Sequence, residues 1–243
     1  MELEYLKPTI FDSSKIISGV TTKNLQLFPP YGLSLSNADI LDDIELERHK
    51  AMFADLLGVH RDKMKYQQQT HSCIVRHINS DSQYENSDGM YTNEKGIVLN
   101  IKIADCTAVL IHDPVRCVVM GLHSGWRGTQ QNITKTGINI LQKEFNSRPE
   151  DLLVYISPAA SGKNYEVGAD VAKYFPRSVV PIASSAKFLF DNRHEICLQL
   201  TDCGVLSNHI EVSPECTIDN ANLHSFRRDK QFSGRMSAFI GLI

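Results

Sequence analysis

The sequence predicts an α+β fold built around a mixed β-sheet. Short segments with strand character alternate irregularly with two segments of helical periodicity, and the clearest strand pair is a hairpin over residues 108–122. This pattern favours α+β over a doubly wound parallel sheet. The 243 residues contain no internal repeat, low-complexity segment or obvious linker, so we expect one domain over residues 1–243.

The first predicted element is a helix over residues 42–57. Its apolar residues can line one face, and a glycine in the next position is suited to cap the C-terminus. The face-lining residues are Ile44, Phe53, Leu56 and Leu57, and the cap is Gly58.

Three strands and a turn are predicted next. Residues 97–103 alternate apolar and polar side chains, as in a half-buried strand. Residues 108–111 and 117–122 are short, apolar and rich in β-branched side chains. Asp113-Pro114 between them marks a turn.

The remaining elements follow the hairpin. A helix is expected over residues 129–145, where apolar side chains recur at helical spacing. Residues 152–156 predict a further strand that ends before Pro158. The recurring helical positions are Ile133, Gly137, Ile140 and Leu141.

Composition and charge exclude several classes of protein. The net charge of −3 gives no chain-wide positive field, so we expect no binding to nucleic acid or to an anionic membrane, although a local cationic pocket is compatible with it. The sequence contains no stretch of about 20 apolar residues, so we expect no membrane span. Residues 1–8 lack the pattern of a secretion signal. Six scattered cysteines then predict reduced thiols or ligands in a cytoplasmic protein.

The predicted hairpin brings a cysteine and a histidine close together. A tight turn over Pro114-Val115 would place Cys106 directly opposite His123. Directly opposed residues have Cβ atoms about 4.5–5.5 Å apart, close enough for a thiolate and an imidazole to share one ion. Pro114 cannot adopt the positive φ of the favoured two-residue turns, so a longer loop would shift the register while keeping the strand ends close.

The spacing alone leaves a second interpretation open. A lone histidine at a strand end is usually a satisfied polar residue, and a lone cysteine is usually a small core residue. The candidate ligands also lack the short C-x-x-C or H-E-x-x-H spacing that identifies a zinc site by itself. The residues alone are therefore compatible with a metal centre and with two ordinary core residues.

The segment from His123 to Gly128 predicts an anion site between a strand and a helix. Gly125 and Gly128 allow close approach of the backbone, the helix start offers N–H groups, and Arg127 adds a planar set of donors. The alternative is a tight turn with Trp126 in the core and Arg127 in solvent. Three C-terminal arginines form either the opposite wall of this pocket or a solvated basic face: Arg227, Arg228 and Arg235.

Several motifs together resemble the YfiH-like family, whose members are called laccase-domain or polyphenol-oxidase-like proteins and purine nucleoside phosphorylases. The resemblance covers about residues 19–240, nearly the whole chain, and the combined motifs are specific. The matching segments are Gln69-Thr70-His71, Ala104-Asp105-Cys106, His123 to Gly128, Asn164 to Val171, Cys216-Thr217, Ser225 to Asp229 and Gly234-Arg235.

The resemblance implies a fold, a metal and an activity. It implies a sandwich-like core of mixed sheets flanked by helices, and a cytoplasmic protein that binds zinc through His71, Cys106 and His123. It also implies phosphorolysis of adenosine, inosine and methylthioadenosine by phosphate, and deamination of adenosine. Three protein ligands leave one zinc position open, as in catalytic sites.

Further residues receive roles within this resemblance. Asp105 adjoins a ligand and Glu166 lies in a matched motif, so either is a candidate acid or base, and Cys106 is the third catalytic candidate. Asp105 is equally well interpreted as a buried turn residue that bonds backbone groups. The residues assigned to nucleoside and phosphate binding are Arg48, Arg127, Tyr165 and Arg228.

Three loop segments depart from the family pattern, at residues 22–25, 34–36 and 157–158. They leave the metal ligands intact but affect the expected substrate preference, so a non-catalytic nucleoside-binding protein is one alternative. A copper-dependent polyphenol oxidase is another, although nine histidines without a His-x-His pair match it poorly. The third is a metal-free hydrolase that uses Cys106 and His123 as a nucleophile and base.

Overall fold

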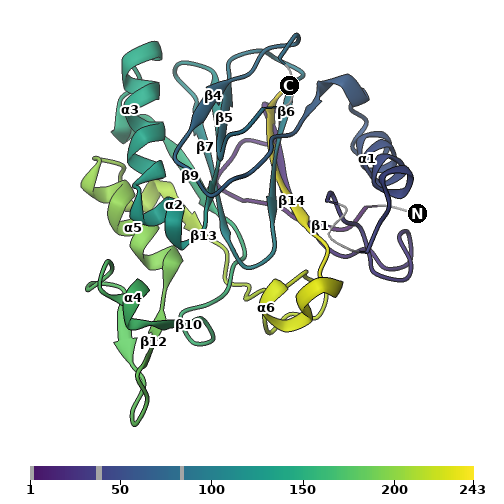
Figure 1. The fold of residues 1–243 in the computed structure, drawn as a ribbon. Helices are drawn as coiled ribbons and strands as arrows, with labels where there is room; N and C mark the ends of the chain where they lie inside the picture. The colour runs from purple at the N-terminus through teal and green to yellow at the C-terminus, as the bar shows by residue number, and fades with distance from the viewer. Residues whose placement is uncertain (1–2, 37–39, 83–84) are drawn as a thin grey trace.

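The computed structural model describes residues 3–36, 40–82 and 85–243. Its strands form two large sheets and one small sheet (Figure 1). Each large sheet combines parallel and antiparallel strand pairs. The predicted α+β class with mixed sheets is therefore confirmed.

The sheets are built from strands that lie far apart in the sequence. The five-stranded sheet has the order β1 (Tyr5–Leu6), β2 (Ile16–Thr21), β14 (Met236–Leu242), β6 (Val98–Ile103) and β3 (Met64–Lys65). The six-stranded sheet has the order β13 (Ile210–Val212), β9 (Leu153–Ile156), β7 (Thr107–Asp113), β8 (Val118–Ser124), β5 (Gly89–Thr92) and β4 (Val75–His77). The small sheet has the order β10 (Glu166–Gly168), β12 (Lys187–Phe190) and β11 (Val179–Pro181).

None of the helices in the described part of the chain is both long enough and apolar enough to span a membrane. The α-helices are α1 (Asp43–Leu57), α2 (Trp126–Gln130), α3 (Ile133–Phe145), α4 (Ala169–Ala172), α5 (Asn192–Asp202) and α6 (Phe226–Asp229). Short 3₁₀ turns are η1 (Arg61–Lys63), η2 (Pro149–Asp151), η3 (Ser207–His209) and η4 (Lys230–Phe232).

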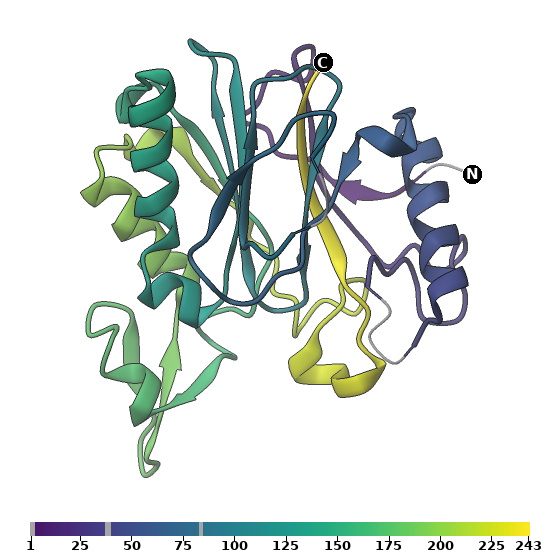
Figure 2. The same ribbon diagram turned by 45° about the horizontal axis from the view of Figure 1, so that its top comes forward.

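The two large sheets pack face to face, and helices cover their outer faces, which gives four layers (Figures 1 and 2). Apolar side chains of both sheets form the central core, among them Ile101, Leu110 and Ile240. Helices α3 and α5 pack on the six-stranded sheet, and α1 packs on the five-stranded sheet. The sandwich expected from the resemblance is confirmed, while the single domain over residues 1–243 stays a prediction.

Helix α1 begins and ends where the sequence predicts. Asp42 caps its N-terminus by accepting a hydrogen bond from the Glu45 N–H, and Gly58 ends it in the left-handed region at φ 67°. Phe53 is buried in the core beneath the helix. The predicted apolar face is wrong at Ile44, whose side chain is 80% exposed because the first turn of α1 faces solvent.

The hairpin between β7 and β8 has a longer loop than a tight turn. Ala108 pairs with His123 and Asp113 pairs with Val118, so four residues, 114–117, form the loop. Asp113 Oδ1 stabilises this loop by accepting the N–H groups of residues 115 and 116. The predicted direct opposition of Cys106 and His123 is therefore wrong, because Pro114 does not fit a two-residue turn.

The helix predicted over residues 129–145 is two helices in the structure. Asn132 adopts φ 57° and separates α2 from α3. This conformation is outside the right-handed helical region, so the helix axis changes direction there. The turn leaves α2 as a short segment directly after β8, beside the candidate ligands.

Candidate metal centre

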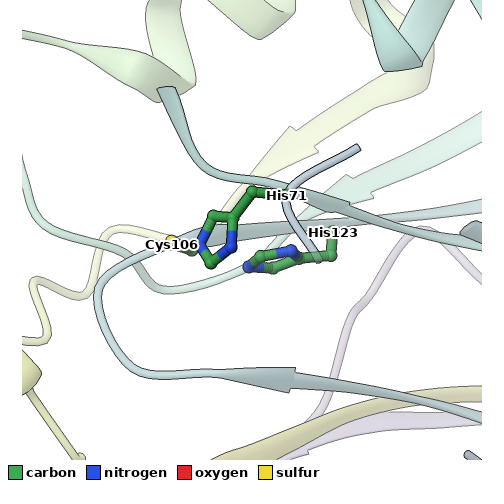
Figure 3. A group of neighbouring side chains, drawn as sticks. All are labelled: His71, Cys106 and His123. Carbon is green, nitrogen blue, oxygen red and sulfur yellow. The ribbon is translucent and has the colours of Figure 1, made fainter. Parts of the chain in front are cut away.

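Three chain segments meet where strands of the six-stranded sheet begin or end. Cys106 directly precedes β7, and His123 lies near the end of β8. Because these strands are antiparallel, both residues lie at the same end of the strand pair. His71 comes from the loop before β4, which lies beyond β5 in the sheet. Figure 3 shows the three side chains gathered around one small space.

The ligand atoms are close enough to hold one ion. One nitrogen or sulfur atom of each residue lies within 4.8 Å of the other two, and the ring centroids of His71 and His123 are 5.0 Å apart. Two imidazoles and a thiolate suit zinc or copper by their donor chemistry. Among the residues that the structure describes, no second group of histidine, cysteine and carboxylate side chains meets the same condition.

Two residues at the centre adopt the left-handed backbone conformation. His71 has φ 60° and Asp105, directly before Cys106, has φ 82°. This conformation is uncommon for residues other than glycine and costs on the order of 1 kcal/mol or more. It persists here because surrounding hydrogen bonds hold both loops in place.

A buried carboxylate, Asp88, orients His123. The Nδ1 atom of His123 donates to Asp88 Oδ1 at 2.8 Å, and the His123 N–H donates to the Asp88 carbonyl at 2.6 Å. Because a carboxylate only accepts, Nδ1 carries the proton and Nε2 is left to bind a metal. Asp88 was not predicted from the sequence, because only its position directly before a strand distinguishes it there.

The same carboxylate holds the loop that carries His71. It accepts the N–H groups of Thr70, His71 and Ser72 at 3.1, 3.0 and 2.7 Å. Burial alone would raise the pKa of Asp88, but the hydrogen bonds from His123 and Ser72 outweigh burial and hold it well below its usual range. Asp88 is therefore an anion that fixes two of the three candidate ligands at once.

Cys106 and His123 alter each other's protonation. Burial alone would raise the pKa of the Cys106 thiol, but the charge of His123 and hydrogen bonds from both histidines lower it. Burial alone would lower the pKa of His123, but the Cys106 thiolate and Asp88 raise it. The pair therefore favours the thiolate, which is the form of cysteine that binds metals and acts as a nucleophile.

Gly125 leaves room for the cysteine sulfur. A Cβ atom at this position would lie 2.8 Å from Cys106 Sγ and 3.4 Å from His71 Cδ2. The first distance is shorter than Cβ contacts in real proteins, so a larger residue must displace the sulfur. A glycine is needed here because the Cys106 sulfur approaches its Cα closely. Its backbone conformation, with φ −73°, is open to any residue.

We expect Gly125→Ala to lower the metal affinity of the purified protein by about tenfold or more, because it displaces one ligand. Alanine adopts the local backbone readily, so the melting temperature should change little. Elemental analysis after dialysis against a weak chelator measures the effect, and Gln130→Ala on the exposed side of α2 is the matched control. A Gly125→Ala protein that keeps its full metal content would contradict the expectation.

The ligand group opens into two adjoining chambers. The larger chamber has a volume of about 370 Å³, and the smaller chamber has a volume of about 150 Å³. Ala104, Cys106 and Phe226 line both, so they lie between the two. All three candidate ligands line the larger chamber, together with Gln68, Gln69, Lys102 and Arg235. Of the candidate ligands only Cys106 lines the smaller chamber, whose lining also includes Trp126, Tyr165 and Arg227.

The two predicted acid or base residues have different surroundings. Asp105 borders the smaller chamber, and its carboxylate oxygens accept hydrogen bonds from Thr217 Oγ1 at 2.6 Å and from the Arg227 N–H at 2.5 Å. Glu166 is exposed and lines neither chamber; its hydrogen bond with Lys187 lowers its pKa. The catalytic role of both stays a prediction, and these bonds favour the interpretation of Asp105 as a turn residue that bonds backbone groups.

Tyr165 lines the smaller chamber, whereas Arg127 lines neither chamber. Arg127 is exposed, and its guanidinium lies 4.4 Å from the ring of Trp126. Burial raises the pKa of Tyr165 to about 12, so its hydroxyl stays protonated and can donate a hydrogen bond. Trp126 is only partly buried and packs against the small sheet rather than in the central core.

The other two arginines predicted to bind substrate have partners within the fold. The guanidinium of Arg228 donates to its neighbour Asp229 and to backbone carbonyls in residues 217–223. This arrangement favours a structural role for Arg228 over a contact with phosphate. Arg48 lies on the exposed side of α1, pairs with Glu45, and lines neither chamber.

A buried neutral histidine fixes the loops behind the larger chamber. Nδ1 of His224 accepts the Gly234 N–H at 3.1 Å, so Nε2 carries the proton and donates to the Leu33 carbonyl at 3.0 Å. Burial lowers the pKa of His224 to about 4. Protonation of this ring would break the bond from Gly234.

We expect His224 to make the protein less stable in acid. An unfolded histidine binds its proton near pH 6.5, whereas the folded protein does so near pH 4, so stability falls as the pH falls through this window. The full effect is on the order of 3 kcal/mol. Urea unfolding at pH 7, 6 and 5 should show a smaller loss for His224→Gln, whose amide supplies one donor and one acceptor; equal losses would contradict the assignment.

The fold and the candidate ligands together define a class of protein. It is an α+β sandwich of four layers with a His–Cys–His candidate metal centre at the strand ends of its larger sheet. Residues 20–243 match the protein family described as multi-copper polyphenol oxidoreductase laccase, and the chain therefore belongs to this family. The predicted family membership is confirmed.

Similar proteins cover nearly the whole chain. The purine nucleoside phosphorylase YlmD of Bacillus subtilis is 29% identical over 95% of this chain and 90% of its own length. A protein of Corynebacterium glutamicum that is also named purine nucleoside phosphorylase is 32% identical over 78% of each chain. The crystal structure of YlmD from Geobacillus stearothermophilus has a TM-score of 0.88 and 26% identity, covering 97% of this chain and 94% of that one.

A second crystal structure, of the YfiH protein from Bacillus licheniformis, has a TM-score of 0.87 and 25% identity. It covers 94% of this chain and 93% of that one. These likenesses agree with the YfiH-like resemblance of the sequence motifs.

Proposed function

We propose that this chain is a zinc-dependent purine nucleoside phosphorylase that acts on adenosine, inosine and methylthioadenosine and also deaminates adenosine. The observation that carries the proposal is the His71, Cys106 and His123 group, which opens into a chamber with two cationic side chains. The names of relatives that match most of the chain support a purine nucleoside as the class of substrate.

Zinc is the metal that we propose for this centre. Three ligands from His and Cys side chains match catalytic zinc sites, and a bound ion would supply Lewis acidity at its open position. A multicopper oxidase requires several histidine-rich sites, whereas the described residues contain one group of three ligands. The hydrogen bond from His123 to Asp88 prepares one ligand nitrogen in advance.

In phosphorolysis, an oxygen of inorganic phosphate forms a bond to C1′ of the ribose while the bond from C1′ to the purine nitrogen breaks. The products are the free purine and the 1-phosphate of the sugar, which is ribose 1-phosphate from adenosine and inosine and methylthioribose 1-phosphate from methylthioadenosine. The chain must hold both substrates in line and keep water from C1′. The rings of Phe226, Tyr165 and Trp126 offer surfaces on which a purine can stack, and Tyr165 adds a hydroxyl donor.

We expect the purified protein to convert adenosine, inosine and methylthioadenosine to their free bases only when phosphate is present. Without phosphate, adenosine should yield inosine. Chromatography and mass spectrometry identify the products, and formation of the sugar 1-phosphate rather than the free sugar distinguishes phosphorolysis from hydrolysis. Binding of nucleosides without any product would identify a non-catalytic nucleoside-binding protein instead.

A further inference from the structure

Two cations on neighbouring strands line the larger chamber. Lys102 lies on β6, and Arg235 directly precedes β14. In the register of these strands Lys102 pairs with Ser237, and Arg235 lies two residues before Ser237. Residues two apart on one strand project to the same face of the sheet, so Arg235 and Lys102 are diagonal neighbours on that face. In typical sheet geometry the Cα atoms of such neighbours are about 7–8 Å apart.

Arg235 is held in place before any ligand binds. Its N–H donates to Ser34 Oγ at 3.0 Å, and its Nη1 donates to the carbonyls of Ser233 and Gly234 at 2.7 and 2.9 Å. A Cβ atom on Gly234 would lie 2.7 Å from the His224 ring, so the backbone at this point is packed against its surroundings. The partners that position the guanidinium are neutral groups.

Lys102 is tied to the segment that carries a metal ligand. The side chain of Gln69 donates to the Lys102 carbonyl at 2.7 Å and accepts the Lys102 N–H at 2.8 Å. Gln69 lies two residues before His71. The same short segment therefore sets the position of the cation relative to the ligand.

Both cations of the larger chamber are partly removed from water. Burial, followed by the charges of Lys50 and Arg235, lowers the pKa of Lys102 to about 8. Burial also lowers the pKa of Arg235. Away from bulk water, the attraction between these cations and a multiply charged anion is stronger than at an exposed surface.

We propose that Lys102 and Arg235 form the binding site for inorganic phosphate, beside the His71–Cys106–His123 group. A planar guanidinium can donate two parallel hydrogen bonds to a tetrahedral oxyanion, and the ammonium group adds a point charge. The inference rests on the proposed function and adds the location of its second substrate. It places phosphate in the larger chamber, which Arg127 does not line.

Protection of Lys102 from acetylation tests the site in the unaltered protein. The full chain is treated briefly with acetic anhydride, with and without inorganic phosphate, and modified lysines are quantified by mass spectrometry. At a phosphate concentration of about ten times its dissociation constant, Lys102 should react about tenfold more slowly. Lys143, exposed on α3, is the internal control and should react at the same rate in both samples.

Three results of this measurement separate the hypotheses. Protection of Lys102 in a protein that fails the product assay would retain the anion site and remove the proposed function. Phosphorolysis without protection would overturn the site. Protection by adenosine monophosphate but not by inorganic phosphate would also overturn it, because the site would then bind a phosphate that belongs to the nucleotide.

Titration calorimetry with inorganic phosphate provides the second test. Lys102→Gln and Arg235→Gln should each weaken phosphate binding by about tenfold or more, because each removes a charged hydrogen bond. Arg116→Gln, in the loop of the β7–β8 hairpin at the other end of the strands, is the control. Wild-type affinity in both chamber variants, or weakening only in Arg127→Gln or after removal of the metal, would overturn the proposal.

Discussion

Replacing Cys106 by alanine is expected to remove most of the bound metal and to abolish phosphorolysis and deamination together. The thiolate is one of the three proposed protein ligands, and two histidines alone would not complete the set. Loss of a direct ligand should exceed the roughly 10–100-fold loss of affinity that follows removal of a ligand's hydrogen-bond partner. Elemental analysis and the product assay measure the two effects on the same preparation.

Cys117→Ala is the matched control, because Cys117 is an exposed thiol in the hairpin loop at the far end of the same strands. It should keep both metal and activity. Unchanged metal in Cys106→Ala would remove Cys106 from the ligand set. An active wild-type protein without metal that Cys106→Ala inactivates would instead identify the Cys106–His123 pair as a nucleophile and base.

The two histidines should behave alike if one centre serves both reactions. Phosphorolysis acts at C1′ and deamination at C6 of the purine, so a single centre that served both reactions would need either two nucleoside poses or different attacking groups. We expect His71→Ala and His123→Ala to lower both rates by similar factors. Loss of only one activity in either variant would mean two separate sites.

The Asp88→Asn variant is expected to bind metal about 10–100-fold more weakly although it changes no ligand. Oδ1 accepts from His71 and His123, and Oδ2 accepts from Thr70 and Ser72. Whichever of the two oxygens becomes the NH₂ group of asparagine, that donor then faces at least two N–H or O–H groups that are donors themselves. His123 loses the fixed position of its proton, and the His71 loop loses its anchor.

Asp113→Asn is a suitable control for the Asp88 variant. Asp113 is also buried, and its carboxylate binds backbone N–H groups, but it lies at the opposite end of β7. Metal affinity is measured by competition with a chromophoric chelator, and the melting temperature shows whether each variant is folded. A folded Asp88→Asn protein with wild-type affinity would show that the histidines keep their positions without this carboxylate.

The sequence alone was sufficient for features that depend on local interactions. The ends of α1 follow from Asp42 and Gly58, since a cap bonds groups within one helical turn. The strand over residues 98–103 follows from the alternation of its side chains. The ligand set was predicted because three short motifs resemble a family in which they occur together, and not because their spacing required a metal.

Tertiary structure decided the features that depend on contacts between distant residues. The register of the hairpin was set by a four-residue loop, and Asn132 divided a helix that periodicity predicted as continuous. Asp88 holds backbone and side-chain groups 16–18 and 35 residues away, which no local pattern shows. The bonds of Arg228 to the backbone of a neighbouring loop were likewise not visible in the sequence, and its predicted contact with substrate stays a prediction.

Lys102 shows the physical reason for this division. In the sequence it is one polar position in an alternating strand, and nothing nearby distinguishes it from a solvent-facing lysine. Its place beside Arg235 arises only because β6 pairs with β14, which follows more than a hundred residues later. Side chains alternate faces along a strand, so the partner of such a residue depends on strand order and register, and these are set by packing of the whole sheet.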